Sequence, residues 1–423
     1  MVTDDFGDDE VEEVGCELGI EIGVHGEHLQ ARDLTRFAVG VGGRQPVCRL
    51  EGAHLLRALE PLGQEVDERG VEVVDAGAKP VEFGERVGIG SSHRHSFTHG
   101  DRSGRNDSPM PFDNRVTRML GVDIPIVQAP MGWIARSPLA SAVSNAGAMG
   151  IIETSSGELD VIKDEIRKMR DLTDKPFGVN IAQAFVRDPA IADFVIEQGV
   201  KFVTTSAGSP TKYTSVLKDG GLTVFHVVPN LVGALKAVDA GVDGLIVEGG
   251  EGGGFKSPRP IASMVLLPLI RSKVDVPIIA AGGFIDGPTM AAALALGAEG
   301  IQMGTRMVSA AESPVHQNWK DAIIQATEAD TVVLGRADKM AMRALRTDRT
   351  NALEFDTDTP PMAAFGNAMD LYFGGDMEAG IALGGQVVGR IESVRPVAEV
   401  ISETADECLR VIEELAKTYG RTL

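Results

Sequence analysis

The sequence predicts an α/β protein, a (β/α)8 TIM barrel with a C-terminal helical extension and a largely unstructured N-terminal segment. Between Gly121 and Thr305, eight short and almost continuously apolar runs alternate with helix-length segments. Such runs suit parallel strands that are buried on both faces, and eight βα units are the number that forms this barrel. Ala-Gly or Gly-Val pairs end several of the helix-length segments, as helix C-caps do.

The strands are expected in the apolar runs, and segments 158–170 and 287–297 are expected to form helices between them. A doubly wound sheet is the alternative fold, but no G-x-G-x-x-G motif follows the first strand. The eight expected strands lie at residues 124–130, 149–154, 177–181, 202–207, 223–228, 244–249, 277–283 and 300–305.

Beyond Thr305 the apolar pattern becomes helical and irregular. We expect a helical subdomain at about residues 310–375. The last part of residues 385–417 is amphipathic. It predicts a final helix that packs on the wall of the barrel.

Residues 1–109 differ in composition from residues 110–423, so we place a domain boundary between them. The first part holds 22 acidic residues against 11 Lys and Arg, and it ends in the polar tract "SSHRHSFTHGDRSGRNDSP". A tract this polar buries too little apolar surface to offset the entropy of ordering. Three interpretations stay open: a disordered leader, a small appended domain, or a mis-assigned start upstream of a true first residue at Met110.

Charge and composition exclude several classes of partner. The net charge of −21 repels nucleic acid and anionic membranes, so neither is an expected partner. No run of 18 apolar residues is present, and the acidic start does not resemble a signal peptide. We expect a cytoplasmic protein.

Cysteine and histidine spacing predicts neither a disulfide framework nor a metal site. No carboxylate or cysteine ligand is placed with the histidine group of the first part, which is His93, His95 and His99. The cysteines show no zinc or disulfide spacing, and they are Cys16, Cys48 and Cys408.

The chemistry of a TIM barrel lies at the C-terminal ends of its strands. The sixth strand ends in the loop "VEGGEGGGFKSP", residues 247–258, in which five of the six residues from Gly249 to Gly254 are glycine. The other strand ends that carry chemistry hold Ala129, Pro130, Met131, Asn180, His226, Glu248, Gly282, Gly283, Gln302, Met303, Gly304 and Thr305.

Glycines at adjacent strand ends indicate a ligand that bears a phosphate. Backbone N–H groups reach a phosphate most easily where no Cβ intervenes, and Gly253, Gly283 and Gly304 with Thr305 meet that need. Asn180 and Gln302 have the amide groups to bind the edge of a planar ring. The alternative for either amide is a buried side chain that neighbouring backbone satisfies.

Six motifs resemble one known family. They are "IPIVQAPMGW", "LASAVSNAGAMGII", "KPFGVNI", "GVDGLIVEGGEGGG", "VPIIAAGGFIDG" and "ALALGAEGIQMGTRM". In this order they are similar to the nitronate monooxygenases, formerly 2-nitropropane dioxygenases. These are FMN-dependent TIM barrels, and the group also includes flavin-dependent enoyl-acyl-carrier-protein reductases. The resemblance starts near Asn114 and continues to the C-terminus, whereas residues 1–109 match nothing in the family.

The resemblance implies FMN as cofactor and assigns its ligands by motif. Asn180 is implied as a flavin ligand, Glu248 stands where the family usually has glutamine, and residues 302–305 are implied as the phosphate and ribityl loop. The full implied set is Ala129, Pro130, Met131, Asn180, Glu248, Gly253, Gly283, Gln302, Met303, Gly304 and Thr305.

Phe255 departs from the family pattern. The family's glycine loop typically reads E-x-G-G-H, and that histidine is implicated in substrate activation, whereas this loop reads "EGGGF". Phenylalanine transfers no proton. His226 is the candidate catalytic replacement, with a satisfied core histidine as the alternative. Phe255 and Lys256 are expected at the substrate, where Lys256 either contacts an anion such as a CoA phosphate or is solvated.

The function expected from the resemblance is an FMN-dependent monooxygenase that oxidises an alkyl nitronate with oxygen. The alternative is a reductase that takes electrons from NADH or NADPH and passes hydride to an enoyl or oxo acyl thioester. A non-flavin isomerase barrel and a non-catalytic flavin-binding protein are the other classes weighed. A homodimer is the expected assembly.

Overall fold

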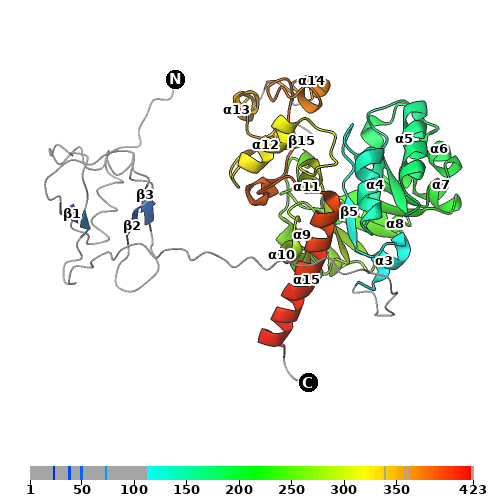
Figure 1. Ribbon diagram of the computed structural model, residues 1–423, viewed down its shortest axis with the longest axis horizontal. Coiled ribbons are helices and arrows are strands. Elements are labelled where there is room, and N and C mark those ends of the chain that lie inside the picture. Colours follow the sequence, from blue (N-terminus) through cyan, green and yellow to red (C-terminus); the bar gives the residue numbers. More distant parts are fainter. Residues whose placement is uncertain are drawn as a thin grey trace, which may run out of the picture. The chain divides into compact units, whose positions relative to one another are not determined.

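The structure is a computed structural model, and it describes residues 112–337, 340–356, 358–360 and 362–420 together with four short strands before them (Figure 1). The chain divides into two compact units, Met1–Ser103 and Gly104–Leu423. In the first, β1 (Ile22–Gly23) pairs with β4 (Glu72–Val73), and β2 (Phe37–Val39) pairs with β3 (Cys48–Leu50). The interpretations of residues 1–109 otherwise fall outside the described residues.

The second unit is a barrel of eight parallel strands in the order β5-β13-β12-β10-β9-β8-β7-β6. A parallel bridge between Val127 and Met149 closes the ring between β5 and β6. All eight strands lie within a residue or two of the predicted runs, so the TIM-barrel prediction is confirmed. Their bounds are β5 (Ile126–Gln128), β6 (Gly150–Glu153), β7 (Phe177–Ala182), β8 (Phe202–Ser206), β9 (Thr223–Val228), β10 (Gly244–Glu248), β12 (Ile278–Ala281) and β13 (Gly300–Met303).

Helices surround the barrel and pack on the outward side chains of the strands. Positive φ angles at Gly147, Gly199 and Gly241 follow α4, α6 and α8, which confirms the predicted helix ends. The helix bounds are α3 (Arg115–Leu120), α4 (Ser137–Asn145), α5 (Leu159–Leu172), α6 (Ile191–Glu197), α7 (Thr214–Asp219), α8 (Leu231–Asp239), α9 (Ser263–Arg271), α10 (Gly287–Ala295) and α11 (Thr305–Val308).

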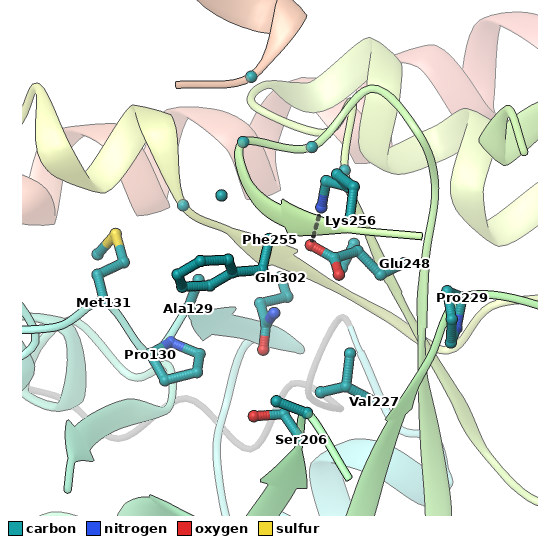
Figure 2. Close-up of a pocket in the computed structure, with 18 of the residues that line it drawn as sticks. Ala129, Pro130, Met131, Ser206, Val227, Pro229, Glu248, Phe255, Lys256 and Gln302 are labelled. Atoms are coloured by element: carbon teal, nitrogen blue, oxygen red, sulfur yellow. Dashed lines mark hydrogen bonds and ion pairs between the residues drawn. The ribbon is translucent and has the colours of Figure 1, made fainter. Parts of the chain in front are cut away.

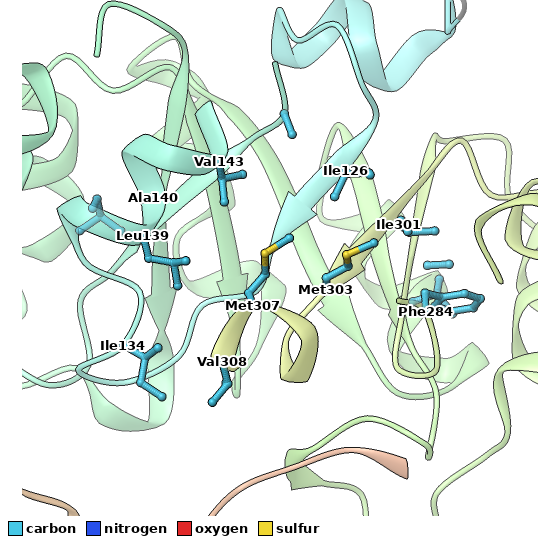
Figure 3. Packing of buried hydrophobic residues seen from close by; sticks show 14 of the residues in the cluster. Ile126, Ile134, Leu139, Ala140, Val143, Phe284, Ile301, Met303, Met307 and Val308 are labelled. Atoms are coloured by element: carbon cyan, nitrogen blue, oxygen red, sulfur yellow. The ribbon is translucent and has the colours of Figure 1, made fainter. Parts of the chain in front are cut away.

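Strand alternation divides the core into two layers. Phe202, Phe225 and Ile246 belong to the cluster inside the barrel, whereas their neighbours along the strands pack outward against the helices. Figure 3 shows the outer layer, in which Ile126 and Met303 belong to one cluster with Leu139, Ala140 and Val143 of α4. The same alternation decides which polar side chains face the inside of the barrel.

The C-terminal segment contains a small sheet that the sequence did not predict. Strands β14 (Thr331–Leu334) and β15 (Ala341–Leu345) lie within the segment expected to be helical, so that expectation was wrong for these residues. They form an antiparallel sheet with β11 (Gly254–Lys256) in the order β11-β15-β14. Runs of four or five residues are too short to show a strand period. The strand that pairs with β15, β11, also lies more than 80 residues earlier in the sequence.

The remaining elements complete this segment and the barrel wall. They are η2 (Gln183–Phe185), η3 (Pro210–Lys212), α12 (Gln317–Gln325), α13 (Asp348–Glu354), α14 (Ala368–Tyr372), η4 (Gln386–Arg390) and α15 (Val397–Tyr419). The predicted final helix, α15, packs against α10 and α4 (Figure 1). Among the described residues, no helix is both long and apolar enough to cross a membrane.

Candidate active site

A cavity of about 520 Å³ opens at the C-terminal ends of the strands (Figure 2). The loops after β5, β10, β12 and β13 form much of its wall, and Leu383 and Gly385 of the C-terminal segment add to it. The residues predicted from strand ends and motifs that line it are Ala129, Pro130, Met131, Asn180, His226, Glu248, Gly253, Phe255, Lys256, Gly283, Gln302, Gly304 and Thr305.

Met303 is the predicted site residue that does not line this cavity. Its side chain is fully buried in the outer core layer, beside Met307 (Figure 3). Because Gln302 faces into the barrel, strand alternation turns Met303 the other way. Its backbone still holds the site together, since the Met303 carbonyl accepts a hydrogen bond from the amide of Ala129 at 2.9 Å.

Asn180 and Gln302 face the barrel interior but differ in how they are satisfied. The amide of Asn180 donates to the hydroxyl of Thr204 at 2.9 Å and to the Thr204 carbonyl at 3.2 Å. The Oε1 atom of Gln302 is buried and has no hydrogen-bond partner among the described residues. An unpaired buried acceptor costs about 1–3 kcal/mol, which a ligand N–H would recover.

His226 faces away from the barrel interior. Its neighbours on β9, Phe225 and Val227, pack inside, so the imidazole lies on the outer face, where its Nδ1 shares a hydrogen bond with the Thr205 hydroxyl at 2.6 Å. Burial, aided by the charge of Lys236, lowers the pKa of His226 from 6.5 to about 4. The ring is therefore neutral near pH 7, and its surroundings resemble those of a satisfied core histidine.

Packing and backbone conformation within the protein explain why the loop is rich in glycine. A Cβ on Gly253 would lie 2.6 Å from the carbonyl carbon of Gly384, so this glycine lets two segments of backbone touch. Gly254 has a φ of 82°, which favours glycine because other residues are strained there. Close packing on the C-terminal segment thus explains Gly253 without invoking a ligand.

Phe255 extends into the cavity from the short strand β11. It pairs with Met342 of β15, and its ring lies 5.1 Å from that of Phe185, which follows β7. The position at which the resemblance implies histidine therefore carries an apolar wall made of two rings tilted by 36° to each other. Figure 2 shows the Phe255 ring between Met131 and the Glu248 side of the cavity.

Lys256 forms an ion pair with Glu248 at the wall of the cavity (Figure 2). The lysine side chain is 4% exposed and the glutamate side chain 26%. Of the two sequence alternatives for Lys256, solvation is wrong, because strand β11 turns its side chain in under the glycine loop. Contact with an anionic substrate stays a prediction.

Sequence reasoning missed a second ion pair beside the cavity, of which the carboxylate, Glu153, lines the wall. Glu153, at the end of β6, is 1% exposed and pairs with Arg136 at 2.9 Å. The same carboxylate accepts a hydrogen bond from the amide of Trp133, whose φ of 59° is rare for a residue with a side chain. Glu153 is the acid at the end of its strand, but no local pattern indicates that Arg136 pairs with it.

Aromatic residues from the C-terminal half were also missed. Tyr372 of α14 lines the cavity and packs against Trp319 at 4.7 Å and Trp133 at 5.9 Å. Burial and the nearby charge of Glu153 raise the pKa of Tyr372, so its hydroxyl stays protonated. Tyr372 lies more than 200 residues after Glu153 in the sequence, so no local pattern predicts that the two line the same cavity.

The fold and the site define a (β/α)8-barrel enzyme whose ligand cavity lies at the C-terminal ends of the strands. Residues 113–407 match the nitronate monooxygenase family, and the chain belongs to it. This family and its structural neighbours are flavin-dependent oxidoreductases.

Three similar proteins show the range of this group. The (3aS,4S,5R,7aS)-5-hydroxy-7a-methyl-1-oxo-octahydro-1H-indene-4-carboxyl-CoA dehydrogenase of Rhodococcus jostii is 38% identical over 239 residues, which cover 56% of this chain and 67% of that protein. The nitronate monooxygenase of Paraburkholderia phytofirmans is 28% identical and covers 70% of this chain and 95% of its own length. The structure of FabK from Thermotoga maritima matches with a TM-score of 0.68 and 38% identity, over 72% of this chain and 99% of that one.

Proposed function

We propose that this protein is an FMN-dependent oxidoreductase that acts on an acyl thioester. The observation that carries the choice of substrate is Phe255, which supplies an apolar ring where the family histidine is implied. A cavity of about 520 Å³ lies within the usual range for a small-molecule site.

The donors and acceptors of the cavity fit a flavin. Gln302 offers an unpaired buried acceptor, and Gly283, with a φ of 98°, leaves its backbone bare after β12. We propose that Asn180, Gln302 and Glu248 hold the ring, and that Gly283, Gly304 and Thr305 hold the phosphate. When bound, FMN supplies the electron transfer, while the barrel positions it and limits access of water.

The relatives favour a thioester over a nitronate. The Rhodococcus jostii protein, at 38% identity, is named as a dehydrogenase of a carboxyl-CoA compound, and the FabK structure is equally similar in sequence. The nitronate monooxygenase of Paraburkholderia phytofirmans is less similar, at 28%. NADH or NADPH is the proposed electron donor when the enzyme works as a reductase.

Oxidation of an alkyl nitronate by oxygen is the second candidate, and the family assignment favours it. In this protein it needs an activating group other than Phe255. His226 faces away from the barrel interior, which makes it a weak candidate.

Visible absorption of the purified full chain under anaerobic conditions distinguishes these functions. We expect a yellow protein that NADH or NADPH bleaches and that an enoyl or oxo acyl-CoA restores. Bleaching by an alkyl nitronate alone would instead establish the monooxygenase. A protein that carries no flavin and takes up no added FMN would refute both functions.

A further inference from the structure

The proposed function leaves the lysines of the cavity without a chemical role. Two lysines of the described chain line the cavity, Lys236 and Lys256. Lys236 belongs to α8 and lies near the outward-facing His226. Lys256 lies next to Phe255, at the wall where the family histidine is implied.

The fold places the Lys256 ammonium with little freedom. Strand β11 pairs Lys256 with Ala341 of β15, and the ammonium meets the carboxylate that ends β10, Glu248. A Cβ on Gly252 would lie 2.8 Å from Nζ, so the bare loop leaves room for this cation. Three features therefore fix the position of the ammonium: the pairing of β11 with β15, the ion pair with Glu248, and the glycine loop beside it.

The pair can do more than stabilise the fold. Burying two charges costs several kcal/mol per ion before they attract each other, so such a pair is weak evidence for a stabilising role. An ammonium has three N–H donors, and the bond to Glu248 uses one of them. The other acidic groups here have their own partners, since Glu153 binds Arg136 and Glu251 accepts hydrogen bonds from Ser263.

We propose that Lys256, positioned by Glu248, donates a hydrogen bond to the substrate oxygen on which negative charge resides during the reaction. In an enoyl thioester this is the thioester carbonyl oxygen, which becomes an enolate oxygen when hydride adds to the β-carbon. In a nitronate it is an oxygen of the nitronate group. A preorganised donor of this kind stabilises charge more strongly in a site shielded from water. The inference rests on the proposed function and replaces the proton-transfer role of a histidine with an electrostatic one.

The test uses the full chain loaded with FMN, to which acetoacetyl-CoA is added as a probe. The enolate of acetoacetyl-CoA has an ultraviolet absorption of its own. We expect the wild type to raise the enolate absorption at neutral pH and Lys256→Met to abolish the rise. Lys256→Arg should retain part of it. Lys218→Met also removes a lysine that is paired with a carboxylate, Asp243, but Lys218 does not line the cavity; it is the matched control, with an expected change below about twofold.

The variant Lys256→Met leaves Glu248 without its partner, so the double variant Lys256→Met/Glu248→Gln guards against misfolding. Flavin content is measured first for each protein. With thioesters as substrates, loss of the donor should lower kcat by roughly 100-fold.

Two outcomes would overturn the inference while leaving the flavin function intact: no rise in enolate absorption with the flavin-loaded wild type, or an undiminished rise with flavin-loaded Lys256→Met. Absence of flavin from the wild type would instead refute the proposed function itself.

Discussion

Single residues show how strand alternation separates binding groups from packing groups. Gln302 faces the cavity and Met303, one residue later, fills the outer core. His226 shows the same alternation, because it lies toward Thr205 on the outer face of β9, whereas Val227 faces the barrel interior. A strand therefore contributes only every second side chain to the barrel interior.

The buried imidazole of His226 predicts a pH dependence of stability. Its pKa is about 4 in the folded protein and 6.5 when unfolded. Between these values the unfolded chain binds the extra proton, so stability is full above pH 6.5 and falls as the pH drops toward 4. One pKa unit corresponds to about 1.4 kcal/mol, so wild type should lose about 2 kcal/mol between pH 7 and pH 5 from this group.

Urea unfolding at pH 7 and pH 5 measures this loss. The control is His226→Gln, which keeps the carboxylates that titrate in the same range but lacks the imidazole. An equal loss of stability in both proteins would show that His226 is already protonated at pH 5 in the folded state.

At the scale of elements, contacts between segments distant in sequence complete the wall of the cavity. Strand β11 exists because β15 offers it a partner, and this pairing brings Phe255 and Lys256 to the site. Helix α15 packs on α10, where Gly287 touches the backbone near Cys408. These pairings determine the positions of side chains that no local pattern specifies.

The contact between α10 and α15 predicts a destabilising glycine substitution. A Cβ on Gly287 would lie 2.1 Å from the Cβ of Glu407 and 2.5 Å from the amide nitrogen of Cys408. Gly287→Ala should therefore push α15 away and cost about 1–3 kcal/mol. Thermal unfolding checks this, with Gly233→Ala in α8 as the control.

The control substitution places its Cβ no closer than 3.4 Å to any neighbour. It should be neutral or stabilise by up to about 1 kcal/mol, because alanine favours helix. Equal melting temperatures for Gly287→Ala and wild type would mean that the two helices pack less closely than the structure indicates.

At the scale of the whole molecule, the described hydrophobic core runs from Phe112 to Cys408. The family match, residues 113–407, covers nearly the same part of the chain. The barrel thus contains the elements that build both its core and its cavity.

A chain that starts at Met110 should therefore behave like the full chain. We expect the same melting temperature within about 2 °C and the same flavin content, because the described core needs no residue before Phe112. Calorimetry and visible absorption of both proteins measure this. A shorter chain that melts much lower, or loses flavin, would assign residues 1–109 a stabilising role.

Most of the fold and much of the candidate site could be predicted from the sequence. Buried parallel strands leave a continuous apolar run, so all eight were found, and the strand-end rule then identified Asn180, Glu248 and Gln302. Strands β14 and β15 were missed because their few residues show no period. Tyr372 was missed because its distance along the chain conceals its place at the cavity.

The sequence by itself determined the barrel, the family and the strand-end residues, because apolar runs, turn glycines and motifs are local signals. Only the tertiary structure decided what those residues do. It paired Lys256 with Glu248, turned His226 outward and packed Gly253 on Gly384. Each of these depends on contacts between segments that are distant in sequence or lie on adjacent strands, and the directions of side chains in such contacts follow from packing rather than from local propensity.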